Sequence, residues 1–205
     1  SLLDKAGAGN YFIKSAFALL GHMRGGPGKA AVVSSAATGL ISGSSIANVV
    51  TTGTFTIPLM KRVGYRPDQA GAVEVSSSVN GQIMPPVMGA ASFVMAEFMG
   101  VSYTSVMLAA AIPALFYYGA LFAAIHFNAI RGGLQGIPRE ELPDLRQLMW
   151  RQGHLFIPVL IIFALLLQGY TATYAAILST ASVWALSWLR RETRVGLRGA
   201  VEALR

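Results

Sequence analysis

Small polar side chains gather between Ser42 and Thr52, in a stretch whose surroundings are almost entirely apolar. A hydroxyl or an amide is carried there, around Gly43, by Ser42, Ser44, Ser45, Asn48, Thr51 and Thr52. Such groups can bind a dehydrated cation or a carboxylate without burying a net charge. Close packing of helices is the alternative, and we prefer that interpretation for Ser34, Ser35 and Thr38. For residues 42–52, which we call the polar tip, the sequence predicts a binding site.

A second polar interruption, Asn80-Gly81-Gln82-Ile83-Met84-Pro85-Pro86, divides an otherwise helical stretch. Pro85 and Pro86 each lack a backbone donor and disfavour helical geometry in the residue before them. Gly81 adds conformational freedom, so we expect the chain to unwind here and to restart as a helix at Val87. A simple proline kink is the alternative. A broken helix presents free carbonyls and free N–H groups, which suit cations and anionic substrate groups respectively.

Glu74 lies one to two turns before this interruption, within an apolar helical stretch. Burying an ionised carboxylate in a membrane is costly, so such an acid is a functional candidate by default. It could carry a proton or pair with a cation. The alternative is a position near the cytoplasmic surface, paired with Lys61 or Arg62. The sequence leaves both interpretations open.

The polar tip lies in the middle of residues 30–60, which contain no charged side chain. Arg24 and Lys29 precede this stretch, and Lys61, Arg62 and Arg66 follow it. If both flanks are cytoplasmic, the chain enters the membrane and returns to the same side. The stretch is too short for two spans of about 20 residues. It accommodates two half-helices of about 12 residues, each reaching about 18 Å, so residues 30–60 predict a re-entrant helical hairpin.

Composition places the chain in a membrane and argues against an enzyme. Only 12% of its 205 residues are charged, against about 25% in soluble domains. The net charge of +7 comes from basic residues at the ends of apolar runs, which indicates membrane topology rather than a nucleic-acid partner. No cysteine, catalytic triad, metal-ligand spacing or phosphate-binding loop is present, so we expect no cofactor. The three histidines flank apolar runs, and we interpret them as interfacial: His22, His126 and His154.

These segments together predict an all-α, polytopic membrane protein. We expect seven parts: an interfacial cytoplasmic segment (1–29), the hairpin (30–60), a broken transmembrane helix (61–100), a plain transmembrane helix (101–130), a cytoplasmic amphipathic helix (131–151), two transmembrane helices (152–189) and a basic cytoplasmic tail (190–205). Every basic cluster then faces the cytoplasm, as the positive-inside rule requires. A single full span over residues 30–60 would break that pattern. We also expect the chain to be part of a longer protein, because it begins at Ser1 and ends in a basic segment.

Two long motifs resemble a known family. They are GLISGSSIANVVTTGTFTIPLMKRVGY (residues 39–65) and AGAVEVSSSVNGQIMPPVMGAASFVMAEFMG (residues 70–100). Both resemble the large membrane subunit of tripartite ATP-independent periplasmic (TRAP) transporters, most closely the TAXI type, in which the small and large membrane subunits are commonly fused. The resemblance implies import of small organic acids (carboxylates) coupled to a cation gradient, across a bacterial or archaeal inner membrane. It also implies a periplasmic substrate-binding protein, a small membrane subunit and an elevator mechanism, in which a transport domain slides against a scaffold.

The resemblance also implies roles for individual residues. In that family, cations bind where a hairpin tip meets a broken helix. The cation-binding residues here would be Gly43, Ser44, Asn48, Gly81, Met84 and Pro86, largely through backbone carbonyls. Ser45 and Thr52 would lie nearest the substrate. Sodium is the expected coupling ion, and Glu74 keeps a proton as the alternative.

The sequence departs from the family in one respect. The family has an inverted repeat, so a second hairpin and a second broken helix should follow, and residues 131–205 contain neither. The chain therefore resembles one half of the repeat, and the remaining half would complete the site. Two other functions stay open: another elevator-type anion symporter, and a non-transporting membrane scaffold subunit. A scaffold would show no cation dependence and would tolerate substitution at Asn48 and Gly81.

Overall fold

The computed structural model describes residues 7–187, and within that range it contains helices and connecting segments without any strand. The all-α fold is therefore confirmed. Its α-helices are α2 (Ala8–Leu20), α3 (Gly26–Ser42), α4 (Ser45–Arg62), α5 (Pro67–Val79), α6 (Ala90–Met99), α7 (Tyr103–Arg131), α8 (Leu145–Gln152), α9 (Ile157–Leu167) and α10 (Ala172–Ser187). Short 3₁₀ helices are η1 (Asn80–Gln82), η2 (Arg139–Glu141) and η3 (Gly153–Phe156). The expected basic tail, residues 190–205, lies outside the described residues.

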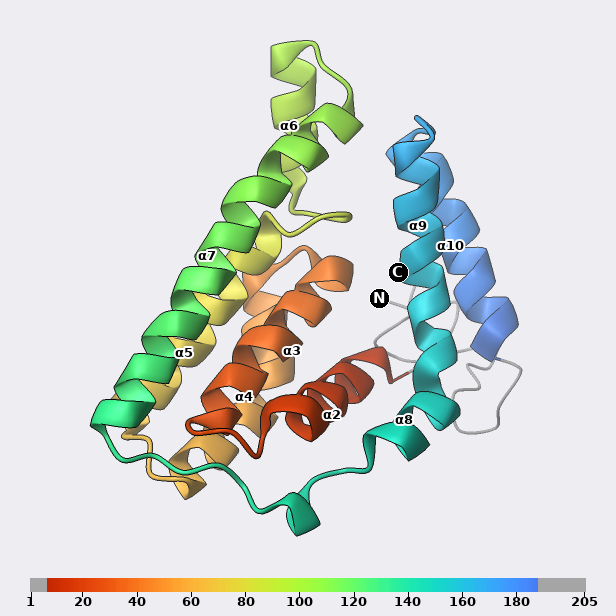
Figure 1. Cartoon of the computed structure of the whole chain (residues 1–205). Helices are drawn as coiled ribbons and strands as arrows, with labels where there is room; N and C mark the ends of the chain where they lie inside the picture. Colours follow the sequence, from red (N-terminus) through yellow and green to blue (C-terminus); the bar gives the residue numbers. More distant parts are fainter. Residues whose placement is uncertain (1–6, 188–205) are drawn as a thin grey trace.

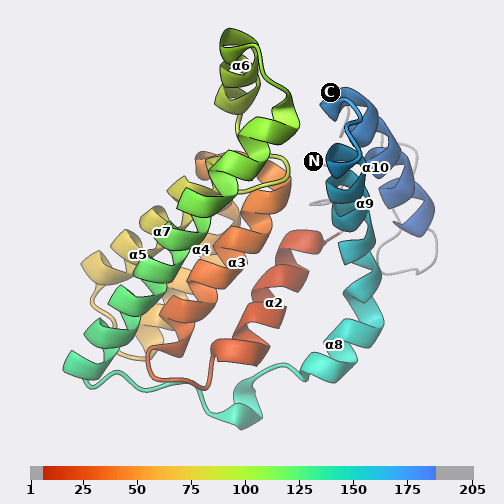
Figure 2. The same ribbon diagram turned by 45° about the horizontal axis from the view of Figure 1, so that its top comes forward.

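The helices form two groups (Figure 1). In the first, α3 and α4 form an antiparallel hairpin, α5 packs against both of them, and α7 lies along α3 and α5. In the second, α9 and α10 pack against each other, and α8 joins them to α2, which in turn lies against α3. The rotated view keeps α9 and α10 to one side of the first group (Figure 2). The first group contains both segments that the sequence predicts to bind ligands.

The hairpin is longer than expected. Its helices contain 17 and 18 residues, so each reaches about 26 Å rather than about 18 Å. The reason is that the helices continue into the basic flanks: α3 begins before Lys29, with Pro27 in its first turn, and α4 ends at Arg62. A re-entrant path through a membrane stays a prediction.

Tyr65 closes the open end of the hairpin. Its hydroxyl donates a hydrogen bond to the carbonyl of Gly25 over 3.0 Å, which ties the segment after α4 to the start of α3. Burial raises the pKa of Tyr65 to about 12, so the phenol keeps the proton that it donates. This contact fixes the two ends of the hairpin relative to each other.

The broken helix is interrupted where the sequence predicts. Helix α5 ends at Val79, η1 follows, and α6 begins at Ala90 rather than at Val87. The later restart has a local cause: Gly89 donates its N–H to the carbonyl of Gln82 over 2.6 Å, which closes a loop around the two prolines. The interruption is therefore an unwound segment and not a simple proline kink.

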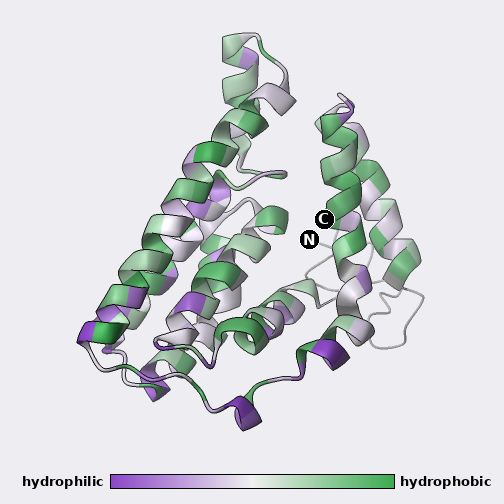
Figure 3. Ribbon diagram, viewed as in Figure 1, coloured by the Kyte–Doolittle hydropathy of each residue, from purple (hydrophilic) through white to green (hydrophobic). Residues whose placement is uncertain are grey.

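Polar side chains are enclosed between α3, α4 and α5, beside apolar clusters, while many large apolar side chains are exposed. Side chains that are fully enclosed include Asn48, Thr52, Thr56 and Glu74, whereas Phe116 on α7 is 76% exposed. Figure 3 shows apolar residues along α7 and α9. Among the described residues, α7 is the one helix long and apolar enough to cross a membrane alone. This arrangement is typical of helices that pack together in lipid.

Two predicted segments differ in length from the observed helices. Residues 152–189 were expected to hold two spans, but α9 contains 11 residues and reaches about 16 Å. Pro158 stands in the first turn of α9 and marks its start after η3. The amphipathic helix predicted over residues 131–151 is the eight-residue α8, preceded by η2 and extended chain.

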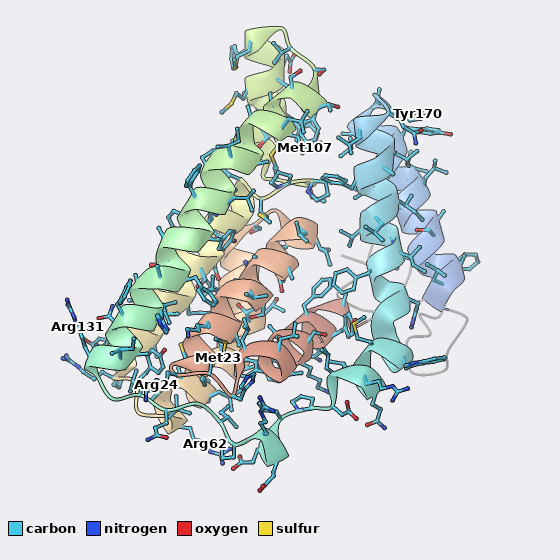
Figure 4. All side chains as sticks on the ribbon, viewed as in Figure 1. Met23, Arg24, Arg62, Met107, Arg131 and Tyr170 are labelled. Atoms are coloured by element: carbon cyan, nitrogen blue, oxygen red, sulfur yellow. The ribbon has the colours of Figure 1, made fainter. Side chains whose placement is uncertain are left out.

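Basic residues from distant parts of the chain meet at one end of the molecule. Figure 4 labels Arg24, Arg62 and Arg131 at this end, and Tyr170 lies at the opposite end. Arg62 pairs there with Glu141 over 2.6 Å. This arrangement agrees with a topology in which the hairpin returns to the side from which it started.

Cysteine labelling tests that topology, because this chain contains no cysteine of its own. We expect Ser102→Cys to react from outside intact cells with a membrane-impermeant thiol reagent. Gln69→Cys and Gln135→Cys, both on exposed residues, should react only after permeabilisation. External labelling of Gln69→Cys in the complete transporter contradicts the re-entrant hairpin.

Candidate functional site

The hairpin turns at Gly43 and Ser44. Gly43 ends α3 with φ of +56°, a left-handed conformation that glycine adopts without a steric cost. The Ser44 side chain then caps α4 by accepting a hydrogen bond from the N–H of Ala47 over 3.4 Å. The hydroxyl of Ser44 is thus occupied by the helix that it starts.

The hairpin touches the broken helix backbone to backbone at two levels. A Cβ atom added to Gly43 would lie 2.1 Å from the carbonyl oxygen of Met88, and one added to Gly39 would lie 2.7 Å from Cα of Gly81. Real side chains do not approach so closely. Glycine at these positions therefore allows the two predicted polar segments to meet, with Gly43 against Met88 and Gly81 against Gly39.

Asn48 lies at this contact and is fully buried. Its Nδ2 donates to the carbonyl of Ser35 over 2.9 Å, whereas its Oδ1 has no hydrogen-bond partner among residues 7–187. A Cβ atom on Gly81 would lie 3.1 Å from Nδ2 of Asn48, so the Asn48 side chain lies against the interruption. Leaving a buried acceptor unpaired costs about 1–3 kcal/mol. An unpaired oxygen at this depth is suited to a cation or an ordered water.

Two helices begin beside the turn. The N-terminus of α4 follows Ser44, and the N-terminus of α6 follows Gly89, which supplies no side-chain cap. Gly89 lies close to Gly43, because an added Cβ would be 3.2 Å from the Gly43 carbonyl oxygen. Gln82 Nε2 donates to Ser45 Oγ over 2.7 Å on the exposed rim. Helix N-termini and an amide donor together favour a negatively charged group.

The other predicted site residues lie farther from the turn or are already engaged. The carbonyl of Pro86 accepts a hydrogen bond from the Tyr103 hydroxyl over 3.0 Å. The Met84 side chain packs against the apolar cluster formed by α3 and α7. Thr52 is enclosed and donates to Glu74, so it lies behind the rim rather than on it.

The structure also places Glu74 where neither basic flank can reach it. Its side chain is 0% exposed and contacts the hydroxyls of Thr52 and Thr56, whereas Arg62 pairs with Glu141 at the surface. Glu74 is therefore neither exposed nor, among the described residues, paired with Lys61 or Arg62, and its depth in a membrane stays a prediction. The sequence signal for this burial is the spacing of Thr52 and Thr56, which lie one helical turn apart on the same face of α4.

Two contacts in the interior were not predicted from the sequence. Lys29 is 1% exposed rather than a solvated flank, and its Nζ lies 2.9 Å from Nδ1 of His126. His126 is therefore a partner of Lys29 and not only an interfacial residue. Ser35, expected to serve helix packing, also contacts the hydroxyls of Thr52 and Ser78 over 3.3 and 3.4 Å.

Sequence comparison relates the chain to a family of membrane permeases. Residues 1–205 match the family described as "Tripartite ATP-independent periplasmic transporter, DctM component". The chain is 28% identical, over 100% of its length, to the sialic acid TRAP transporter large permease protein SiaM of Vibrio cholerae, and covers 47% of that protein.

Two further relatives are named after other compounds. The chain is 31% identical, over 91% of its length, to the C4-dicarboxylate TRAP transporter large permease protein DctM of Rhodobacter capsulatus, and covers 46% of it. It is 26% identical, over 85% of its length, to the ectoine/5-hydroxyectoine TRAP transporter large permease protein UehC of Ruegeria pomeroyi, and covers 41% of it. The chain thus spans less than half the length of each of these relatives.

Substitution of the turn glycine tests the backbone contact. Gly43→Ala places a side chain in a left-handed conformation, which costs about 1–2 kcal/mol, and against the carbonyl of Met88. We expect a lower melting temperature of the purified transporter. Gly119→Ala is the matched control, because nothing lies within 4 Å of an added Cβ on α7. Equal melting temperatures for the two variants contradict a close contact at Gly43.

Proposed function

The chain belongs to the DctM-component family of tripartite ATP-independent periplasmic transporters, and we propose that it forms part of a cation-driven importer of small organic acids. The contact between the hairpin and the broken helix is the observation that supports this proposal most strongly. It encloses Asn48, whose Oδ1 is buried and has no partner in the part of the chain that the structure describes. A dehydrated sodium ion is a suitable partner for that oxygen and for the backbone carbonyls at the turn and at the interruption.

The substrate in this proposal is a carboxylate. The N-termini of α4 and α6 lie beside the turn and favour an anionic group, and Ser45 and Gln82 offer hydrogen-bonding groups on the rim. Sialic acid, C4-dicarboxylates and ectoine, the compounds in the names of the relatives, all carry a carboxyl group. This shared group is the chemistry that we propose the rim recognises.

The chain works with partners in this proposal. A periplasmic substrate-binding protein delivers the substrate, and a small membrane subunit, separate or fused, accompanies the permease. The remaining half of the permease supplies a second hairpin and a second broken helix, since this chain covers less than half of its relatives. The complex lies in a bacterial or archaeal inner membrane with several spans, and the transport domain moves as an elevator. Transport, rather than catalysis, is the activity.

Reconstituted uptake tests the proposed transport. Vesicles that contain the complete transporter receive its binding protein and radiolabelled succinate, sialic acid or ectoine, under an imposed sodium or pH gradient. We expect concentrative uptake of at least one compound under a cation gradient. Uptake of none, with the binding protein saturated by its compound, supports the scaffold alternative and overturns the proposal.

Substitution of Asn48 tests the cation site. We expect Asn48→Ala to lower the apparent sodium affinity about tenfold, or about 1.4 kcal/mol, because the sodium ion loses an oxygen ligand. Asn128→Ala, on the exposed far end of α7, is the control and should leave that affinity unchanged. An identical dependence of uptake on sodium in the wild type and in Asn48→Ala removes Asn48 from the site.

A further inference from the structure

Glu74 is enclosed between α4 and α5 by hydroxyl groups. Thr52 and Thr56 contact its two carboxylate oxygens, and Ser78 donates to Oε1 over 3.3 Å. Helix α4 approaches directly at Gly53, where an added Cβ would lie 3.2 Å from Cγ of Glu74. The carboxyl group therefore has oxygen partners from both the hairpin and the broken helix.

Among the described residues, no basic side chain forms an ion pair with this carboxylate. Apart from Glu74 itself, the charged or titratable groups on α5 and on the helices packed against it are Lys29, Lys61, Arg62, Asp68, Tyr103, Tyr117, Tyr118, His126 and Arg131. The hydroxyls of Tyr117 and Tyr118 donate to the carbonyls of Ser76 and Ser77 on α5, and that of Tyr103 donates to the carbonyl of Pro86. Lys29 contacts His126, Arg62 pairs with Glu141, and Asp68 pairs with Arg66. Within residues 7–187, none of them forms an ion pair with Glu74. An enclosed carboxylate without a counter-charge is costly in its ionised form.

The surrounding hydroxyls can satisfy Glu74 in two protonation states. Thr52 Oγ1 lies 2.8 Å from the carbonyl of Asn48, and Thr56 Oγ1 lies 3.0 Å from the carbonyl of Thr52. When Glu74 is ionised, both hydroxyls donate to the carboxylate. When Glu74 is protonated, its O–H donates to one hydroxyl oxygen, and that hydroxyl turns to the carbonyl one helical turn back. No polar group loses its last partner in either state.

We propose that Glu74 is a proton-binding site, which takes up one proton at one face of the membrane and releases it at the other during transport. This proposal rests on the proposed cation-driven import and names the proton as an ion that this chain carries. Uptake forms one O–H bond on a carboxylate oxygen with a proton from water, and release breaks the same bond. No electron transfer and no other reactant is involved.

The proton site is connected to the contact at Asn48. Ser35 Oγ lies 3.3 Å from Thr52 Oγ1 and 3.4 Å from Ser78 Oγ, and the carbonyl of Ser35 accepts from Asn48 Nδ2. Rotation of the Thr52 hydroxyl therefore changes its hydrogen bonds to the Asn48 carbonyl and to Ser35 Oγ. Proton binding at Glu74 and cation binding at the hairpin should influence each other, and by linkage the influence is reciprocal.

Infrared difference spectroscopy of the complete transporter at varied pH tests the proposal without any substrate. We expect one component of the carboxyl carbonyl band to change with pH in the wild type and to be missing from Glu74→Gln, while the components of exposed acids stay in both. Glu97→Gln, an exposed acid on α6, is the matched control and should keep the component that Glu74→Gln lacks. If Glu74→Gln removes no pH-dependent component of the wild-type band, the proposal is overturned.

Vesicles with an entrapped pH indicator provide the transport measurement, with radiolabelled succinate, sialic acid or ectoine as the probe. We expect probe uptake by the wild type to acidify the interior, and Glu74→Gln to lose this acidification. Sodium-driven uptake without acidification in the wild type overturns the proton site and leaves the proposed import intact. If Glu74→Gln does not assemble, Glu74→Asp keeps a carboxyl group on a shorter side chain. The midpoint of its infrared band should then move, and an unmoved midpoint counts against the proposal.

Discussion

The close approach of two backbones, from the hairpin and from the broken helix, fixes the rest of the site. Gly39 lies against Gly81, and Gly43 lies against the carbonyl of Met88, at separations that leave no room for a side chain. Because the backbones meet there, Asn48 is buried, the N-terminus of α6 lies beside the start of α4, and Glu74 is covered by α4. A methyl group added to Gly39 or Gly43 would have to displace the backbone that it meets.

A second constraint is that polar side chains are buried between helices, whereas apolar side chains face outward. The interior between α3, α4 and α5 holds hydroxyls, an amide and a carboxylate, whereas the outer face of α7 is largely exposed hydrocarbon. In lipid, apolar side chains gain little by turning inward, and polar groups must find partners inside the protein. The hydroxyls of α4 therefore satisfy both the helix carbonyls and Glu74, and the exposed apolar residues of α7 need no protein partner.

Much of this arrangement follows from the sequence. Gly43 with its neighbouring serines predicts the turn, and Pro85 with Pro86 predicts the interruption, because local backbone chemistry decides both. The lengths of α3 and α9 do not follow from hydropathy, since helix ends are set by capping and by glycine and proline rather than by the limits of an uncharged run. Contacts between helices that are distant in the sequence could not be predicted either. Lys29 on α3 contacts His126 on α7, and no residue near Lys29 in the sequence indicates that pairing.

We propose that the hairpin turn and the interruption of the broken helix form one cation site. Hydrogen–deuterium exchange of the complete transporter, in sodium and in potassium at equal ionic strength, tests whether one ion binds both segments. If one ion joins the two segments, residues 39–53 and residues 78–90 should gain protection together in sodium, over the same concentration range, and should stay unprotected in potassium. Protection of only one segment, or equal exchange in both salts, would contradict the account.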